Sequence, residues 1–159
     1  MEGEYLIWLP DGTELVIPNL IPDGGKDEFY KMIFQNVTAI AGGANWYIGM
    51  CDQLPAAANV LTDITTEPTV TFGYARKAVV RSAVGWPTIS AVNGRRAITS
   101  LAVTWTAAGG PFSRTFSRLF LTDQAAGTVG KLYSLSGAIT VPLVVLDTQS
   151  VLASYRLYI

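Results

Sequence analysis

The strongest constraint on the fold is a series of short segments in which apolar and polar residues alternate. In residues 150–158 the apolar positions recur at every second residue, at Val151, Ala153, Tyr155 and Leu157. A period of two is typical of a strand with one buried face. About eight such segments follow residue 45, separated by turn residues at roughly 8–15-residue intervals. We therefore predict a mainly β fold, specifically a jelly-roll-like antiparallel β-sandwich.

Residues 100–123 contain two of these segments, and we expect them to form a central hairpin. Leu101, Val103 and Trp105 alternate with small or polar residues. Gly109-Gly110-Pro111 then interrupts the pattern, because glycine permits unusual backbone angles and proline lacks an amide donor. The second segment carries an aromatic face, formed by Phe112, Phe116 and Phe120.

The chain begins with a second hairpin signal. Asp11-Gly12 lies between two β-rich segments, residues 4–9 and 13–17, and both turn residues tolerate positive φ. A Pro- and Gly-rich stretch follows, so we interpret residues 1–25 as a hairpin arm and linker that packs on its own body or on a neighbouring subunit.

Residues 26–42 are predicted to contain a short helix, which leaves residues 43–159 for the β-sandwich domain. Apolar residues recur there at helical spacing, at Phe29, Met32, Ile33, Val37 and Ile40. Gly42 and Gly43 mark its end.

Charge is scarce and unevenly distributed. Only 14% of residues are charged and the net charge is −1, so the overall balance predicts neither nucleic-acid nor membrane binding. The first 30 residues hold seven acids (Glu2, Glu4, Asp11, Glu14, Asp23, Asp27 and Glu28). Between Glu67 and Asp123 all the charged residues are basic (Arg76, Lys77, Arg81, Arg95, Arg96, Arg114 and Arg118). The acidic and basic parts could pair within one molecule or between neighbours, or could simply be solvated.

Residues suited to catalysis are few. The chain has no histidine, which removes the commonest general base and zinc ligand, and Cys51 lies in an apolar segment. Asp52, Asp63 and Glu67 share one loop and could form a paired-carboxylate site or bind Ca²⁺, although solvated or capping roles are more frequent. The four tryptophans suggest core or interface packing more than a sugar-stacking platform. We predict a non-enzymatic protein without a cofactor or metal.

Several motifs in residues 43–159 resemble those of small bacteriophage virion proteins of the head-decoration (cement) or tail-fibre kind. They are W-Y-I-G-M-C-D at 46–52, E-P-T-V-T-F-G-Y-A-R-K at 67–77, G-W-P at 85–87, F-L-T-D at 120–123 and the closing strand. The resemblance implies a capsid decoration protein that stabilises the head by bridging subunits. Its partners would be the major capsid protein and further copies of itself, as a trimer, and it would reside in the virion after synthesis in the host cytoplasm.

In this interpretation the hairpin arm and the basic residues form the partner interface, and we single out Tyr5, Leu6, Trp8, Leu15, Arg76, Arg81, Arg95 and Arg96. One alternative is a tail protein that binds a receptor or glycan through loops 52–71 and 83–96, and another is a glycan-active enzyme. An exposed Trp86 beside loop acids would favour binding or hydrolysis, whereas a buried Trp86 would favour the structural role.

Overall fold

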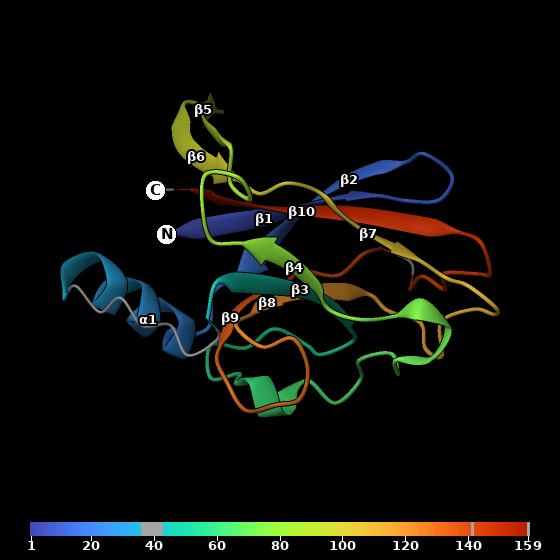
Figure 1. Ribbon diagram of the computed structural model, residues 1–159. Helices are drawn as coiled ribbons and strands as arrows, with labels where there is room; N and C mark the ends of the chain where they lie inside the picture. Colours follow the sequence, from blue (N-terminus) through green and yellow to red (C-terminus); the bar gives the residue numbers. More distant parts are fainter. Residues whose placement is uncertain (36–42, 141, 159) are drawn as a thin grey trace.

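The computed structural model describes residues 1–35, 43–140 and 142–158 (Figure 1). It contains ten strands and one α-helix, α1 (Asp23–Phe34). The strands are β1 (Glu2–Trp8), β2 (Glu14–Leu20), β3 (Asn45–Cys51), β4 (Lys77–Val80), β5 (Thr88–Val92), β6 (Arg95–Thr99), β7 (Val103–Thr106), β8 (Arg118–Thr122), β9 (Leu132–Ser136) and β10 (Ser150–Tyr158). The prediction of a mainly β fold is confirmed.

The strands form one antiparallel sheet that curls into a half-barrel. Their order is β4-β3-β8-β9-β2-β1-β10-β6-β5, and β7 pairs with β10 beside β6. Strand β2 joins the two halves, because residues 14–18 pair with β1 whereas Asn19 and Leu20 pair with β9. The two halves of this continuous sheet face each other across one core.

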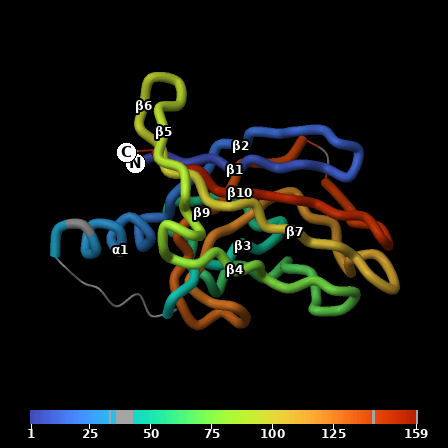
Figure 2. Tube along the Cα trace, turned by 45° about the horizontal axis from the view of Figure 1, so that its top comes forward, coloured from blue at the N-terminus to red at the C-terminus, as the bar shows by residue number. Residues whose placement is uncertain are grey.

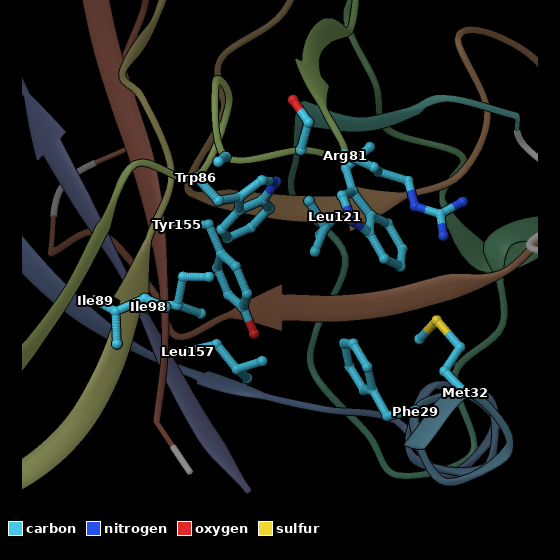
Figure 3. A pocket seen from close by; sticks show the side chains of 12 residues that line it. Phe29, Met32, Arg81, Trp86, Ile89, Ile98, Leu121, Tyr155 and Leu157 are labelled. Carbon is cyan, nitrogen blue, oxygen red and sulfur yellow. The ribbon is translucent and has the colours of Figure 1, made fainter. Parts of the chain in front are cut away.

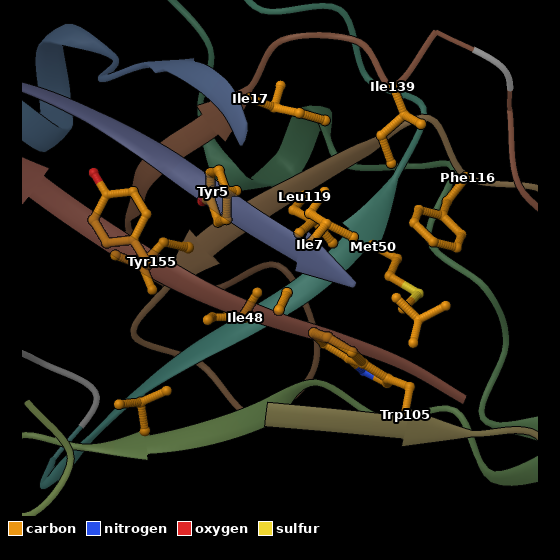
Figure 4. Close-up of a cluster of buried hydrophobic side chains, with 14 of the residues drawn as sticks. Tyr5, Ile7, Ile17, Ile48, Met50, Trp105, Phe116, Leu119, Ile139 and Tyr155 are labelled. Atoms are coloured by element: carbon orange, nitrogen blue, oxygen red, sulfur yellow. The ribbon is translucent and has the colours of Figure 1, made fainter. Parts of the chain in front are cut away.

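Side chains from both halves meet in the core (Figure 4). Tyr5 and Ile7 of β1, Ile48 and Met50 of β3, and Trp105 of β7 are completely or almost completely buried. The indole N–H of Trp105 donates to the Ala75 carbonyl at 2.8 Å, which ties β7 to the segment that leads into β4. This contact brings the two halves together on the side away from α1.

The N-terminal hairpin is part of this core, which corrects the interpretation of residues 1–25 as a separate arm. The Asp-Gly hairpin itself is confirmed, since β1 pairs with β2 along residues 4–8. However, β1 also pairs with β10 along its whole length, from Glu2 to Trp8. Tyr5 is fully buried and its hydroxyl donates to Ser134 Oγ at 3.0 Å, so β1 lies at the centre of the sheet.

Helix α1 begins earlier than the sequence predicts. Pro22 precedes its first turn, and Gly24 and Gly25 lie inside the helix rather than in a linker. A Cβ atom at Gly25 would lie 3.0 Å from the Leu132 carbonyl oxygen and from Tyr133 Cα, so glycine lets the helix approach β9 closely. The predicted continuation through residues 36–42 lies outside the described residues.

The predicted central hairpin is wrong. Strand β7 pairs with β10 and β8 pairs with β3 and β9, so the two aromatic segments belong to different halves of the sheet. Gly109 and Gly110 have positive φ values of 81° and 153° and reverse the chain, but they do not join two paired strands. Residues 138–140 and 142–146 also lie outside the strands, and Leu143 forms an isolated bridge with Phe116.

Candidate functional site

The loop acids do not converge on a catalytic or metal site. Asp52 accepts a hydrogen bond from Ser117 Oγ at 2.7 Å, and Asp63 accepts one from the Val60 backbone N–H at 2.9 Å. Asp63 thus supports its own turn, whereas Asp52 ties the end of β3 to the residue before β8. In residues 1–35, 43–140 and 142–158, no three Asp, Glu, Cys or His side chains are grouped as metal ligands. The carboxylate-pair and calcium interpretations therefore gain no geometric support.

Glu67 instead forms an ion pair with the buried side chain of Arg76. Arg76 Nε lies 2.9 Å from Glu67 Oε1, and Arg76 Nη2 lies 2.8 Å from Oε2, in the bidentate geometry that a guanidinium favours. The Tyr74 hydroxyl donates to Glu67 Oε1 at 2.7 Å and accepts the Met50 N–H at 3.0 Å. The spacing of Glu, Tyr and Arg in the motif at 67–77 thus ties this loop to β3.

The guanidinium of Arg76 also binds a second loop, which connects β8 to β9. It donates to the carbonyls of Gln124 and Gly127 at 3.1 and 2.8 Å, and its Cζ lies 5.1 Å from the centroid of the Phe120 ring. The side chain is only 2% exposed. Arg76 therefore organises two loops within the chain, and its assignment to the partner interface is wrong.

Other predicted interface residues differ in their accessibility. Tyr5 and Leu6 are buried in the sheet, so they cannot insert between subunits while the chain is folded. Trp8 is partly buried at the end of β1, and Leu15 is partly buried against the core. The lone Cys51 is also a core residue, and burial raises the pKa of its thiol to about 12.

Arg95 and Arg96 lie on a hairpin, β5–β6, that projects from the body of the sheet (Figures 1 and 2). Its turn is Asn93-Gly94, and both residues have positive φ, as a two-residue hairpin requires. Strand β5 pairs with β6 alone among the described strands, so its other edge is open. Ile89 on this strand is 64% exposed.

An apolar pocket of about 470 Å³ opens between α1 and the β5–β6 hairpin (Figure 3). Figure 3 shows Trp86, Tyr155, Ile98 and Leu157 on one side, Phe29, Met32 and Arg81 on the other, and Leu121 between them. Trp46, Ser82, Ala83 and Ile89 complete the lining. Its volume lies within the range of small-molecule sites, roughly 300–1,000 Å³.

The polar side-chain groups of this pocket are few and lie on Trp46, Arg81, Ser82, Trp86 and Tyr155. The guanidinium of Arg81 packs over the Trp46 ring, 5.3 Å from its centroid, and donates to the Gly43 carbonyl at 2.9 Å. The indole N–H of Trp86 is buried and has no hydrogen-bond partner within the described chain. Because the lining includes no carboxylate, the pocket does not resemble a glycosidase site.

The tryptophans do not form a sugar-binding platform. Trp46 and Trp105 are buried in the core, and Trp86 is partly buried in the pocket wall. The pocket and the open edge of β5 were missed in the sequence, because their residues come from separate segments that share no local pattern. The sequence signals in this region are the G-W-P motif at 85–87, which contains the pocket residue Trp86, and the turn dipeptide Asn93-Gly94.

No family model matches the chain, and neither the curated proteins nor the solved structures contain a match to it. Within the described residues, α1 is too short and too polar to cross a membrane.

Proposed function

We propose that this chain is a non-enzymatic structural protein of a bacteriophage particle that decorates the head by bridging capsid subunits. The motifs in residues 43–159 suggest the class of protein. The open edge of the projecting β5–β6 hairpin is the observation that carries the proposal, because it offers an attachment point outside the folded core.

The register of the hairpin identifies which backbone groups are free. In a two-residue hairpin the pair beside the turn, here Val92 and Arg95, is hydrogen-bonded, and bonded and non-bonded pairs then alternate. Ser90 and Thr88 therefore bond to β6, whereas Ile89 and Ala91 direct their N–H and C=O groups outward. An extended segment can add to such an edge as a further strand.

The charge of the hairpin indicates the chemistry of that segment. Arg95 and Arg96 are exposed. Arg95 contacts Glu2, but this pair is open to solvent, and a carboxylate from a partner can replace Glu2 at small cost. We therefore propose that an extended, acidic segment of the major capsid protein pairs with β5.

The proposal also includes a trimer of this chain and a jelly-roll-like relation between the two halves of the sheet. The low fraction of charged residues supports self-association, since apolar surface favours burial between subunits. The facing halves of the sheet, with one core between them, support the second point.

A glycan-binding tail protein is the alternative, with loops 52–71 and 83–96 as its binding rim. The structure gives it less support, because Trp86 lines an apolar pocket without carboxylates and the other aromatic side chains near it are core residues. A tail location would nevertheless be revealed by the experiment that follows.

The test compares variants for incorporation into particles made by the phage that encodes the chain. Ala91→Pro removes an outward N–H without breaking a β5–β6 hydrogen bond, and Arg96→Glu reverses the charge of the hairpin. Arg114→Glu is the matched control, because Arg114 is exposed and lies outside the hairpin. We expect both hairpin variants to remain folded and to lose attachment to heads. The control variant Arg114→Glu should attach to heads like the unchanged protein. Normal incorporation of Ala91→Pro, or a chain found only with tails, would refute the proposal.

A further inference from the structure

The apolar pocket between α1 and the β5–β6 hairpin carries an inference that goes beyond the proposed structural role and does not rest on it. Its walls come from elements that are held in place independently of any ligand. Phe29 packs edge-on against Tyr133 with centroids 5.6 Å apart, and Trp46 lies 4.4 Å from the same ring. Trp86 packs edge-on against Tyr155 at 6.3 Å. The pocket is therefore preformed, which lowers the entropic cost of filling it.

The lining determines what can bind. Aromatic and aliphatic side chains form most of it, so a sugar or a nucleotide would lose hydrogen bonds to water without replacing them. An alkyl chain loses no hydrogen bonds in the same transfer, and the burial of each CH₂ group is favourable. A volume of about 470 Å³ suits one such chain.

The guanidinium of Arg81 specifies the other end of the ligand. It has five N–H groups, of which one has a hydrogen-bond partner within the described residues, the Gly43 carbonyl. It does not compete with a carboxylate of the lining, since the lining has none.

We propose that this pocket binds a single-chain anionic amphiphile, a free fatty acid, with its alkyl chain between Phe29 and Tyr155 and its carboxylate at Arg81. A charge-assisted hydrogen bond from the guanidinium would hold the carboxylate at the rim, where the ionised group keeps contact with water. The apolar walls would supply most of the affinity, and Arg81 would select an acid over an uncharged molecule of the same length.

The proposal is tested by calorimetric titration of the purified chain with dodecanoate, below its micellar concentration, and with dodecanol. We expect dodecanoate to bind saturably with one site per chain. Arg81→Gln should weaken dodecanoate binding about tenfold, the lower end for a hydrogen bond to a charged group, and change dodecanol binding by less than about twofold. Arg114→Gln is the matched control and should bind like the unchanged protein.

A second variant keeps the test independent of Arg81's contacts with Trp46 and Gly43. Ala83 lines the pocket and is itself exposed, so Ala83→Phe should fill the entrance without disturbing the core. It should abolish binding of both ligands at an unchanged melting temperature, whereas Ala126→Phe, on an exposed loop away from the pocket, should not. Absence of saturable binding by the unchanged chain, full binding by Ala83→Phe, or equal weakening of both ligands by Arg81→Gln would overturn the proposal. None of these results bears on attachment to heads.

Discussion

Replacing Glu67 by Gln should destabilise the fold more than any single change at a surface ion pair. Arg76 is 2% exposed and Glu67 is 20% exposed, so the substitution leaves a guanidinium sealed in the protein without its counter-charge. Breaking a buried pair from one side costs about 3–5 kcal/mol. For a chain of 159 residues, this corresponds to a loss of about 6–20 °C in melting temperature.

The reverse change, Arg76→Met, should cost less, about 2–3 kcal/mol. The remaining carboxylate keeps its hydrogen bond from Tyr74 and its partial contact with water. The double variant should then lose at least about 1 kcal/mol less than the sum of the single variants, because the two side chains act as one unit.

Urea denaturation, followed by tryptophan fluorescence, measures all three free energies. Lys26→Gln is the control, since Lys26 and Asp23 form an ion pair whose side chains are 40% and 67% exposed. Exposed pairs contribute little, and we expect a change below about 0.5 kcal/mol. A loss below about 1 kcal/mol for Glu67→Gln would refute the view that this pair holds the two loops on the sheet.

Four further results are expected. Deletion of residues 1–20 should abolish folding, because β1 and β2 connect the two halves of the sheet, and a soluble, folded remainder by circular dichroism would contradict this. Gly85→Ala should destabilise the protein by more than about 1 kcal/mol in urea, since its Cβ would lie 2.1 Å from the Val80 carbonyl oxygen. Cys51 should not react with a thiol reagent at pH 8 until the chain unfolds, because burial raises its pKa to about 12. Burial raises the pKa of Tyr155 to about 12 and that of Tyr5 well above 10, so the unfolded chain loses these protons first. Stability should therefore be complete below about pH 10 and fall above it, and a melting temperature constant from pH 8 to 11.5 would argue against this burial.

Local patterns in the sequence predicted the elements whose formation depends on near neighbours. Asp11-Gly12 predicted the first hairpin, and Asn93-Gly94 is a turn signal of the same kind for β5–β6, because glycine is needed at positive φ in both. Alternation identified β10 over residues 150–158, where one face is buried along nearly the whole strand.

Pairing between distant segments could not be predicted in the same way. The two aromatic segments around Gly109 are neighbours in sequence, yet each finds its partner elsewhere, since alternation specifies a buried face but not the adjacent strand. The N-terminal hairpin shows the same limit. Its apolar residues indicated that the hairpin packs against another part of the protein, but they did not indicate that β10 is its partner.

The candidate sites could not be predicted from the sequence for a related reason. Glu67, Tyr74 and Arg76 lie in one motif of the sequence. The burial of Arg76, however, depends on contacts with the loop at residues 124–127, which is distant in the sequence. The pocket needs α1, β3, the segment after β4 and β10 at one end of the half-barrel. A polar or apolar side chain acquires such a role only when tertiary packing sets its surroundings.

The abundance of this chain in purified phage particles tests the account most directly. Heads and tails would be separated by density-gradient centrifugation, and quantitative mass spectrometry would compare this chain with the major capsid protein in each fraction. The account predicts a fixed ratio to the major capsid protein in the head fraction, which Ala91→Pro abolishes. Absence of the chain from particles, or its confinement to tails, would contradict the proposed role as a head decoration protein.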